Sequence, residues 1–307
     1  MFQQSKSFIW IFFTLALALG LSACASVSTS EPFDLTQDGP ASTPQATFTP
    51  ELPTPTPEPM ALTVNGEGIT VVDFNAEVQR YTSAQNGLGK EVPSADAASA
   101  VIQNYIAELL LAQAARENGF TLDEAALQAR IDALAAEIGG ADALSTWQNA
   151  QGYREQAFRS ALRRGAEAAW MRDKIVSNVP GTAEQVHVQQ ILLYNQDTAQ
   201  SFLTQLNGGS DFDELALRAD PLTRGDLGWV PRGYLLDEQI ETTAFGLEVG
   251  QYSDVITTDV GFHILKILAR DPNRLLSPDA LLSLQELALN DWVEEQKQTA
   301  DVVLAPQ

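Results

Sequence analysis

The chain is poor in two residue types that often build reactive centres. Its 307 residues include one cysteine and two histidines. A single cysteine excludes an intramolecular disulfide. The sequence also contains no cysteine–histidine spacing typical of zinc sites, no glycine-rich phosphate loop and no Ser/His/Asp set. We therefore expect neither a metal nor another cofactor.

Positive charge is scarce as well. Lys and Arg number 18 against 40 Asp and Glu, which gives a formal net charge of −22. This balance argues against nucleic acid and against an anionic membrane surface as direct partners. The apolar fraction, 45%, is ordinary for a globular protein. The length suits about two domains.

The first 23 residues form a targeting segment. Lys6 supplies a weak positive start, and Phe8 to Leu21 is uncharged and strongly apolar. A run this short predicts a secretory signal rather than a membrane-spanning helix. Cys24 is either a chance free thiol or a lipidation site. The Leu-Ser-Ala-Cys ending resembles a bacterial lipoprotein signal, which implies cleavage before Cys24 and acylation of its sulfur, each buried CH2 contributing about 0.8 kcal/mol to membrane binding.

A tether follows over residues 24–59. It is rich in Thr, Pro and Ser and ends in the alternating prolines of residues 53–59. Proline fixes φ, so we expect an extended and rather stiff spacer. The signal and the tether together predict a chain that works outside the cytoplasm, anchored to a membrane.

Helical periodicity dominates residues 60–180. A short hairpin is expected first, with Asn65-Gly66 as its turn. Apolar residues at i, i+3 and i+4 then predict several helices from Ser94 to Val179. Near the C-terminus, residues 277–300 predict one more helix and residues 302–304 a closing strand. Four arginines on the last helix before Val179 are expected to form a solvated face: Arg154, Arg159, Arg163 and Arg164.

Residues 181–271 mix strands and helices. A strand is expected at 186–193, two helices from 197 and 211, a tight turn at 225–228, a third helix ending near 246, and strands at 255–258 and 263–268. Two strings in this stretch resemble the parvulin family of prolyl isomerases: Gly-Asp-Leu-Gly-Trp from Gly225 and Gly-Phe-His-Ile-Leu-Lys from Gly261. The predicted order β-α-α-α-β-β is what that family shows.

The segment from Asn65-Gly66-Glu67 through Ile69-Thr70 also resembles the start of SurA-like periplasmic chaperones. Together the two resemblances imply an α+β protein. A helical chaperone domain, residues 60–180, would receive the parvulin domain, residues 181–271, as an insertion. The C-terminal segment, residues 272–307, would pack its helix back onto the helical domain.

The parvulin resemblance implies rotation about X-Pro bonds. This reaction needs no nucleophile or metal, but an apolar pocket for the proline ring and polar groups that favour the twisted amide. His263 matches the second histidine of the family, the alternative being an ordinary core or surface histidine. The first is replaced by Gln190, which can donate and accept hydrogen bonds but cannot titrate near neutral pH. Period-2 alternation places His187 on the opposite face from Gln190.

The remaining site residues follow from the same resemblance. Asp220, before a shortened loop, matches the polar residue that faces the histidines, or it is simply a turn residue preceding Pro221. The ring pocket would use Leu227, Ile240 and either Leu235 or Leu236, with Leu236 preferred. Each of these could instead be an ordinary core residue.

Two functions are therefore open. The first is a lipid-anchored, extracytoplasmic prolyl isomerase and foldase that acts on Pro-containing exported polypeptides through His263, Gln190 and Asp220. The second is a chaperone that retains the fold with little or no catalysis and holds unfolded clients in its helical domain. Gln190 and the short loop after Asp220 motivate the second.

Overall fold

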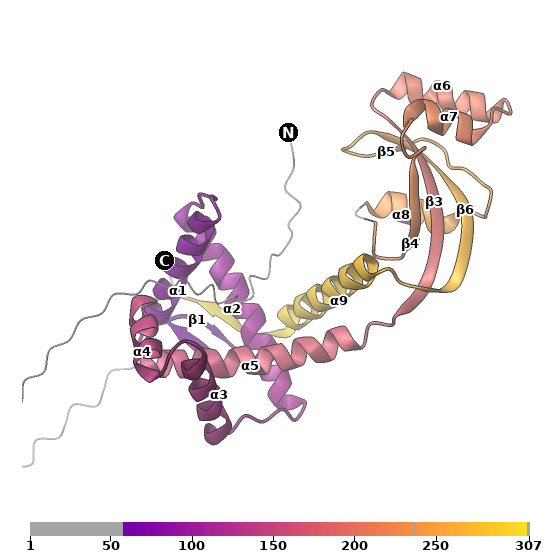
Figure 1. Cartoon of the computed structure of the whole chain (residues 1–307). Helices are drawn as coiled ribbons and strands as arrows, with labels where there is room; N and C mark the ends of the chain where they lie inside the picture. Colours follow the sequence, from indigo (N-terminus) through magenta and orange to yellow (C-terminus); the bar gives the residue numbers. More distant parts are fainter. Residues whose placement is uncertain (1–57, 236, 306–307) are drawn as a thin grey trace, which may run out of the picture.

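The computed structural model describes residues 58–235 and 237–305. They form a helical part and a part built on a four-stranded sheet, which lie at opposite ends of the molecule in Figure 1. The signal segment, Cys24 and the tether up to Pro57 lie outside the described residues, as does Leu236. Among the residues described, no helix is long and apolar enough to cross a membrane.

The helical part begins and ends with strands of one small sheet. Strands β1 (Met60–Val64) and β2 (Glu67–Thr70) form the expected hairpin, and Asn65 and Gly66 take the positive φ angles of its turn, 52° and 83°. The expected closing strand is β7 (Val302–Leu304), which pairs with the other edge of β1. Both ends of the folded chain therefore meet in the helical part.

Six helices complete the helical part. Thr70 caps the first by accepting a hydrogen bond from the Asp73 amide, and Ser277 caps the last in the same way from Ala280. Their bounds are α1 (Val71–Gly87), α2 (Ser94–Glu117), α3 (Glu124–Glu137), α4 (Ala141–Ala150), α5 (Glu155–Ser177) and α9 (Pro278–Thr299).

One apolar cluster ties the C-terminal helix to the N-terminal ones. Leu289 and Val293 of α9 are buried against Leu111 of α2 and Met171 of α5. Trp292 packs on the same cluster. Because α9 follows the sheet part in sequence, the helical part is discontinuous.

The sheet part contains four antiparallel strands in the order β4-β3-β6-β5. Its sequence of elements differs from the predicted one, because a further strand occupies most of the expected tight turn. Asp226 to Pro231 extend as β4 since they pair with β3. The bounds are β3 (Thr182–Leu193), α6 (Gln196–Asn207), α7 (Phe212–Ala219), β4 (Asp226–Pro231), α8 (Glu238–Gly246), β5 (Ile256–Thr257) and β6 (Phe262–Leu275).

The two faces of this sheet bury different helices. Ile191 and Ile264 pack with α6 and α7, while Val188 and Leu265 pack with Ala244 and Phe245 of α8. Figure 1 shows α6 and α7 together at one end of the long strands. The side chains of β3 and β6 therefore alternate between two separate cores.

Gly225 lies very close to the backbone of β3 at Gln190, and this close approach can be tested. A Cβ on this residue would lie 1.8 Å from the backbone oxygen of Gln190, and its φ is +67°. Gly225→Ala should therefore lower the free energy of unfolding by about 3 kcal/mol or more, because the backbone of Gly225 or Gln190 must move to make room for the added Cβ. Gly209→Ala, at φ +93° with nothing within 4 Å, is the control. It should cost only about 1 kcal/mol. Equal urea midpoints for the two variants would contradict the close approach.

Candidate active site

Gln190 and His263 come from the two central strands. The antiparallel register pairs Gln190 with Leu265 and Leu192 with His263. Opposed residues share a face, and so do residues two apart along a strand. Leu265 belongs to the core covered by α8, so Gln190 and His263 lie on the α8 face.

The imidazole of His263 is held on both sides. Its Nδ1 lies 3.1 Å from Oε1 of Gln190, and its Nε2 lies 2.9 Å from Oγ1 of Thr258. An amide oxygen only accepts, so Nδ1 carries the hydrogen; the Thr258 hydroxyl donates to Nε2, which is closer to it than its other acceptor, the Gly261 carbonyl at 3.4 Å. The ring is 5% exposed. The site therefore holds one neutral tautomer of His263.

The charge state of His263 agrees with this geometry. Burial lowers its pKa from the ordinary value of 6.5, because water no longer solvates the imidazolium. The carboxylate of Asp237 acts in the opposite direction and favours the charged form. Asp237 also caps α8 by accepting a hydrogen bond from the Ile240 amide. No motif or spacing in the chain indicates that Asp237 lies close enough to influence the site.

Thr258 is a second site residue that sequence reasoning missed. It lies at the turn between β5 and β6, where its hydroxyl also accepts from the amide of Val260. Backbone hydrogen bonds between Thr258 and Gly261 close the turn, and it packs on the end of β3, since a Cβ on Gly261 would lie 2.6 Å from the Leu193 backbone oxygen. A threonine five residues before a histidine is not a recognisable motif. Its contact with His263 depends on the conformation of the turn between them.

Asp220 does not contact the Gln190–His263 pair directly. Its carboxylate accepts from the amides of Leu222 and Thr223 and from the Thr223 hydroxyl, and these bonds lower its pKa, the hydroxyl most. Among the described residues, Asp220 makes no hydrogen bond to Gln190 or His263. The Thr223 hydroxyl accepts from the amide of Gly225, whose carbonyl accepts from the amide of Gln190. Asp220 is thus linked to the strand through the loop.

The expected ring-pocket residues that the structure describes lie on β4, on α8 and in the loop between them. Leu227 lies on β4 and is 36% exposed. Ile240 lies in the first turn of α8, and both Ile240 and Leu235 pack against the core beneath Gln190 and His263. Leu236, the preferred member of the pair, lies outside the described residues.

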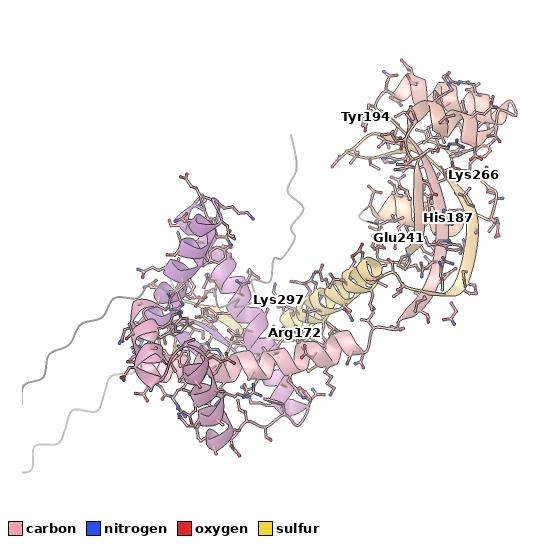
Figure 2. All side chains as sticks on the ribbon, viewed as in Figure 1. Arg172, His187, Tyr194, Glu241, Lys266 and Lys297 are labelled. Carbon is pink, nitrogen blue, oxygen red and sulfur yellow. The ribbon has the colours of Figure 1, made fainter. Side chains whose placement is uncertain are left out.

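His187 lies away from the site, as the alternation predicted. It faces Trp229 across the strands, with ring centroids 5.4 Å apart, and its Nε2 lies 2.8 Å from Oδ1 of Asp226. Figure 2 shows His187 partway along the sheet, far from Tyr194, which follows the last residue of β3. His187 cannot replace the histidine that is missing at Gln190.

Comparison with known protein families identifies both parts. Residues 190–269 match the model of the PpiC-type prolyl isomerase (rotamase) domain, and residues 54–162 match the SurA-like N-terminal domain. The chain contains a PpiC-type domain and a SurA-like domain. The PpiC-type match begins at Gln190 and includes His263.

Curated relatives resemble part of the chain. A "Foldase protein PrsA" of Geobacillus sp. (strain WCH70) is 36% identical over 94 residues, which are 29% of this chain and 34% of that protein. A "Parvulin-like PPIase" of Rickettsia typhi is 34% identical over 108 residues, 33% of this chain and 38% of that one. The matches thus span about a third of each relative.

Solved structures are also similar. PrsA from Bacillus cereus is 20% identical, with a TM-score of 0.41, and covers 76% of this chain and 83% of its own. The parvulin domain of PpiD from E. coli is 31% identical, with a TM-score of 0.27, and covers 30% of this chain and 92% of its own.

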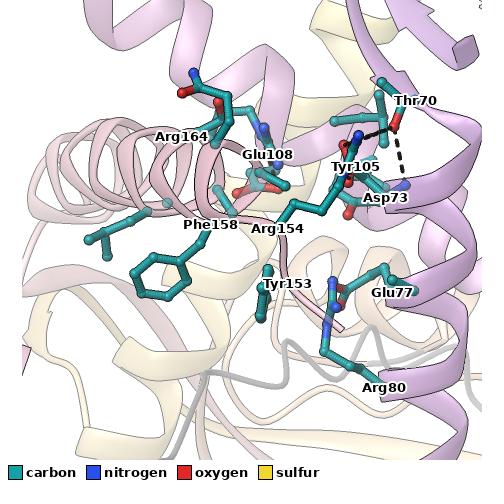
Figure 3. A pocket seen from close by; sticks show the side chains of 18 of the residues that line it. Thr70, Asp73, Glu77, Arg80, Tyr105, Glu108, Tyr153, Arg154, Phe158 and Arg164 are labelled. Carbon is teal, nitrogen blue, oxygen red and sulfur yellow. Dashed lines mark hydrogen bonds and ion pairs between the residues drawn. The ribbon is translucent and has the colours of Figure 1, made fainter. Parts of the chain in front are cut away.

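The helical part holds a cavity of about 880 Å³ between β2, α1, α2 and α5. Its size lies in the range of ligand pockets. Figure 3 shows Arg154, the residue before α5, reaching toward Thr70 and Asp73 at the start of α1. Arg154 also pairs with Glu58. Of the four arginines expected on a solvated face, Arg154 is exposed, whereas Arg164 departs from the prediction because its side chain is only 13% exposed in the cavity wall.

The walls of the cavity combine aromatic rings with paired charges. Arg80 pairs with Glu77 and lies over the ring of Tyr153, 3.9 Å from its centroid. Arg164 is less well paired: its Nε is buried without a hydrogen bond, 3.8 Å from the carboxylate of Glu108. Burial raises the pKa of Glu108, although Arg164 opposes the shift. The Arg164–Glu108 pair is therefore a buried ion pair in the cavity wall.

The electrostatics of the site can be checked by titration. In Asp237→Asn the pKa of His263 should fall further below 6.5, because the charge that favours the imidazolium is removed while Asn still caps α8. Asp211→Asn, which changes the cap of α7 in the same way, is the control. The imidazole carbon shifts, followed by NMR against pH, give both values. A rise in the His263 pKa in Asp237→Asn would refute the assignment.

Proposed function

We propose that this protein is a lipid-anchored, extracytoplasmic peptidyl-prolyl isomerase and foldase that acts on Pro-containing segments of exported polypeptides. The observation that carries the proposal is the Gln190–His263 hydrogen bond above an apolar core, inside the segment that matches the PpiC-type domain. The relatives named foldase and parvulin-like PPIase support it. The lipoprotein-like ending at Cys24 supports the anchor.

The chemistry requires a preference for the twisted amide. Rotation of an X-Pro bond breaks C–N resonance, which localises a lone pair on the prolyl nitrogen and reduces the charge separation of the amide. A water-poor site with a hydrogen-bond donor near that nitrogen lowers the barrier, because it favours the twisted form over the planar one.

Gln190 can supply that donor. Its Oε1 is taken by His263, and no described residue accepts a hydrogen bond from its amide nitrogen. In this proposal the neutral His263, held by Thr258, orients the Gln190 amide, and the amide N–H groups meet the client. Leu227, Leu236 and Ile240 receive the proline ring. Asp220 acts indirectly by holding the loop that fixes the Gln190 strand.

The isomerase activity is tested on the fragment from Met60 to the C-terminus. The fragment should accelerate cis–trans exchange of an Ala-Pro peptide above the uncatalysed rate, measured in a protease-coupled assay. His263→Ala should lower kcat/KM about tenfold or more, since the Gln190 amide loses its orientation. His187→Ala, on the other face, is the control and should retain most activity. Equal rates with and without the fragment would refute the proposed isomerase function.

A second variant tests whether glutamine at position 190 limits catalysis. Gln190→His restores the residue that the parvulin pattern has at this position. If Gln190 limits the site, kcat/KM should rise about tenfold in the same assay. If Gln190 is the working donor that we propose, activity should stay level or fall. Gln190→Ala should be less active than the parent protein in either case.

The cavity in the helical part favours a second function, the holding of unfolded clients. Arg80 and Glu77 in its wall carry hydrogen-bonding groups of both kinds, a guanidinium that donates and a carboxylate that accepts. The surrounding aromatic residues offer apolar contact for a client side chain. Within this proposal the helical part binds the client and the PpiC-type part acts on its prolines.

Filling the cavity separates holding from catalysis. Ala161 lines the cavity, so Ala161→Phe should reduce its volume without removing a charge. We expect this variant to lose most suppression of client aggregation, followed by light scattering of a reduced, unfolding protein, while its prolyl isomerase rate is unchanged. Ala125→Phe on the exposed surface of α3 is the control. Full suppression by Ala161→Phe would show that clients bind elsewhere.

A further inference from the structure

The first turns of α9 contact the PpiC-type part, although the rest of α9 belongs to the helical part. Leu289 and Val293 fix the helix on α2 and α5, and the Gln285 amide donates to the Val176 carbonyl at 3.3 Å. Leu284 and Leu287 lie on either side of Gln285 and N-terminal to Leu289 and Val293. The position of this leucine pair is therefore set by the helical part.

The leucine pair meets Gly233, in the loop between β4 and α8. A Cβ on Gly233 would lie 2.7 Å from Cδ2 of Leu287 and 3.2 Å from Cδ2 of Leu284, and the φ of Gly233 is +81°. A side chain at this position would strain the backbone and displace the ends of the two leucine side chains. The loop is thus in close apolar contact with α9.

The same loop is braced from its other side by α8. The Gly233 amide donates to the Glu241 carboxylate at 2.8 Å, and the neighbouring Arg232 lies over the Phe245 ring, 4.0 Å from its centroid. Figure 2 shows Glu241 on the side of the PpiC-type part that is closest to α9. Gly233 is solvent-exposed but contacts both helices, α8 through the Glu241 bond and α9 through the leucine pair.

The residues that follow Gly233 form the apolar side of the site. Tyr234 and Leu235 pack on the core beneath Gln190 and His263, together with Ile240. Asp237, four residues beyond Gly233, begins α8. A displacement of Gly233 would therefore move the ring pocket, and active-site geometry is sensitive to shifts of about 1 Å.

We propose that Leu284 and Leu287 are positioning residues for the prolyl isomerase site: through Gly233, α9 sets the loop that binds the proline ring. The inference rests on the proposed isomerase function for its kinetic consequence. Its structural consequence is that the position of the β4–α8 loop depends on the leucine pair. This consequence holds whether or not the protein is an isomerase. The helical part thereby influences the pocket of the PpiC-type part without contacting the client there.

The test uses Leu284→Ala/Leu287→Ala in the full-length protein. Loosening the ring pocket should raise KM for an Ala-Pro peptide about threefold or more while kcat changes less, because the Gln190–His263 pair is untouched. A loss of folded protein would instead lower apparent kcat at constant KM. Leu282→Ala, on the same helix and 56% exposed, is the control and should match the parent.

A second measurement keeps the inference testable if the parent protein has no isomerase activity. Backbone amide NMR shifts of Leu235 and Ile240 should move in the double variant and stay in place in Leu282→Ala. Unchanged shifts at both residues, or an unchanged KM in an active protein, would overturn the inference. An inactive parent with shifted resonances would refute the isomerase proposal alone.

Discussion

The structure depends on one antiparallel pairing, that of β3 with β6. The pairing brings Gln190 within hydrogen-bonding distance of His263, although 73 positions separate them in sequence. The same strands continue toward α5 and α9, the two helices that pack together in the helical part. A shift of one residue in this register would place Gln190 and His263 on opposite faces.

This pairing also explains the tolerance of a glutamine at the site. The imidazole of His263 needs an acceptor for Nδ1–H, and an amide oxygen serves as well as a second imidazole nitrogen. The Gln190 backbone is fixed by the Gly225 carbonyl, so the side chain starts from a defined point. What changes is the chemistry offered to the client: a neutral amide N–H replaces a group that can titrate.

Local patterns predicted much of the fold. The Asn65-Gly66 hairpin, the closing strand at residues 302–304 and the place of His263 followed from turn chemistry, alternation and motif resemblance. Strand β4 did not, because its extension comes from pairing with β3 rather than from its own residues. Thr258 and Asp237 were missed for the same reason: each reaches His263 through tertiary folding, which no spacing in the chain records.

The central claim is that the Gln190–His263 pair and its apolar surroundings catalyse prolyl isomerisation. The most direct measurement is NMR exchange spectroscopy on an X-Pro peptide mixed with substoichiometric labelled protein. The account predicts cis–trans exchange cross-peaks that the peptide alone does not give, and shift changes concentrated at Leu227, Ile240 and His263. An unchanged exchange rate, with shift changes confined to the helical part, would contradict it and leave a client-holding chaperone.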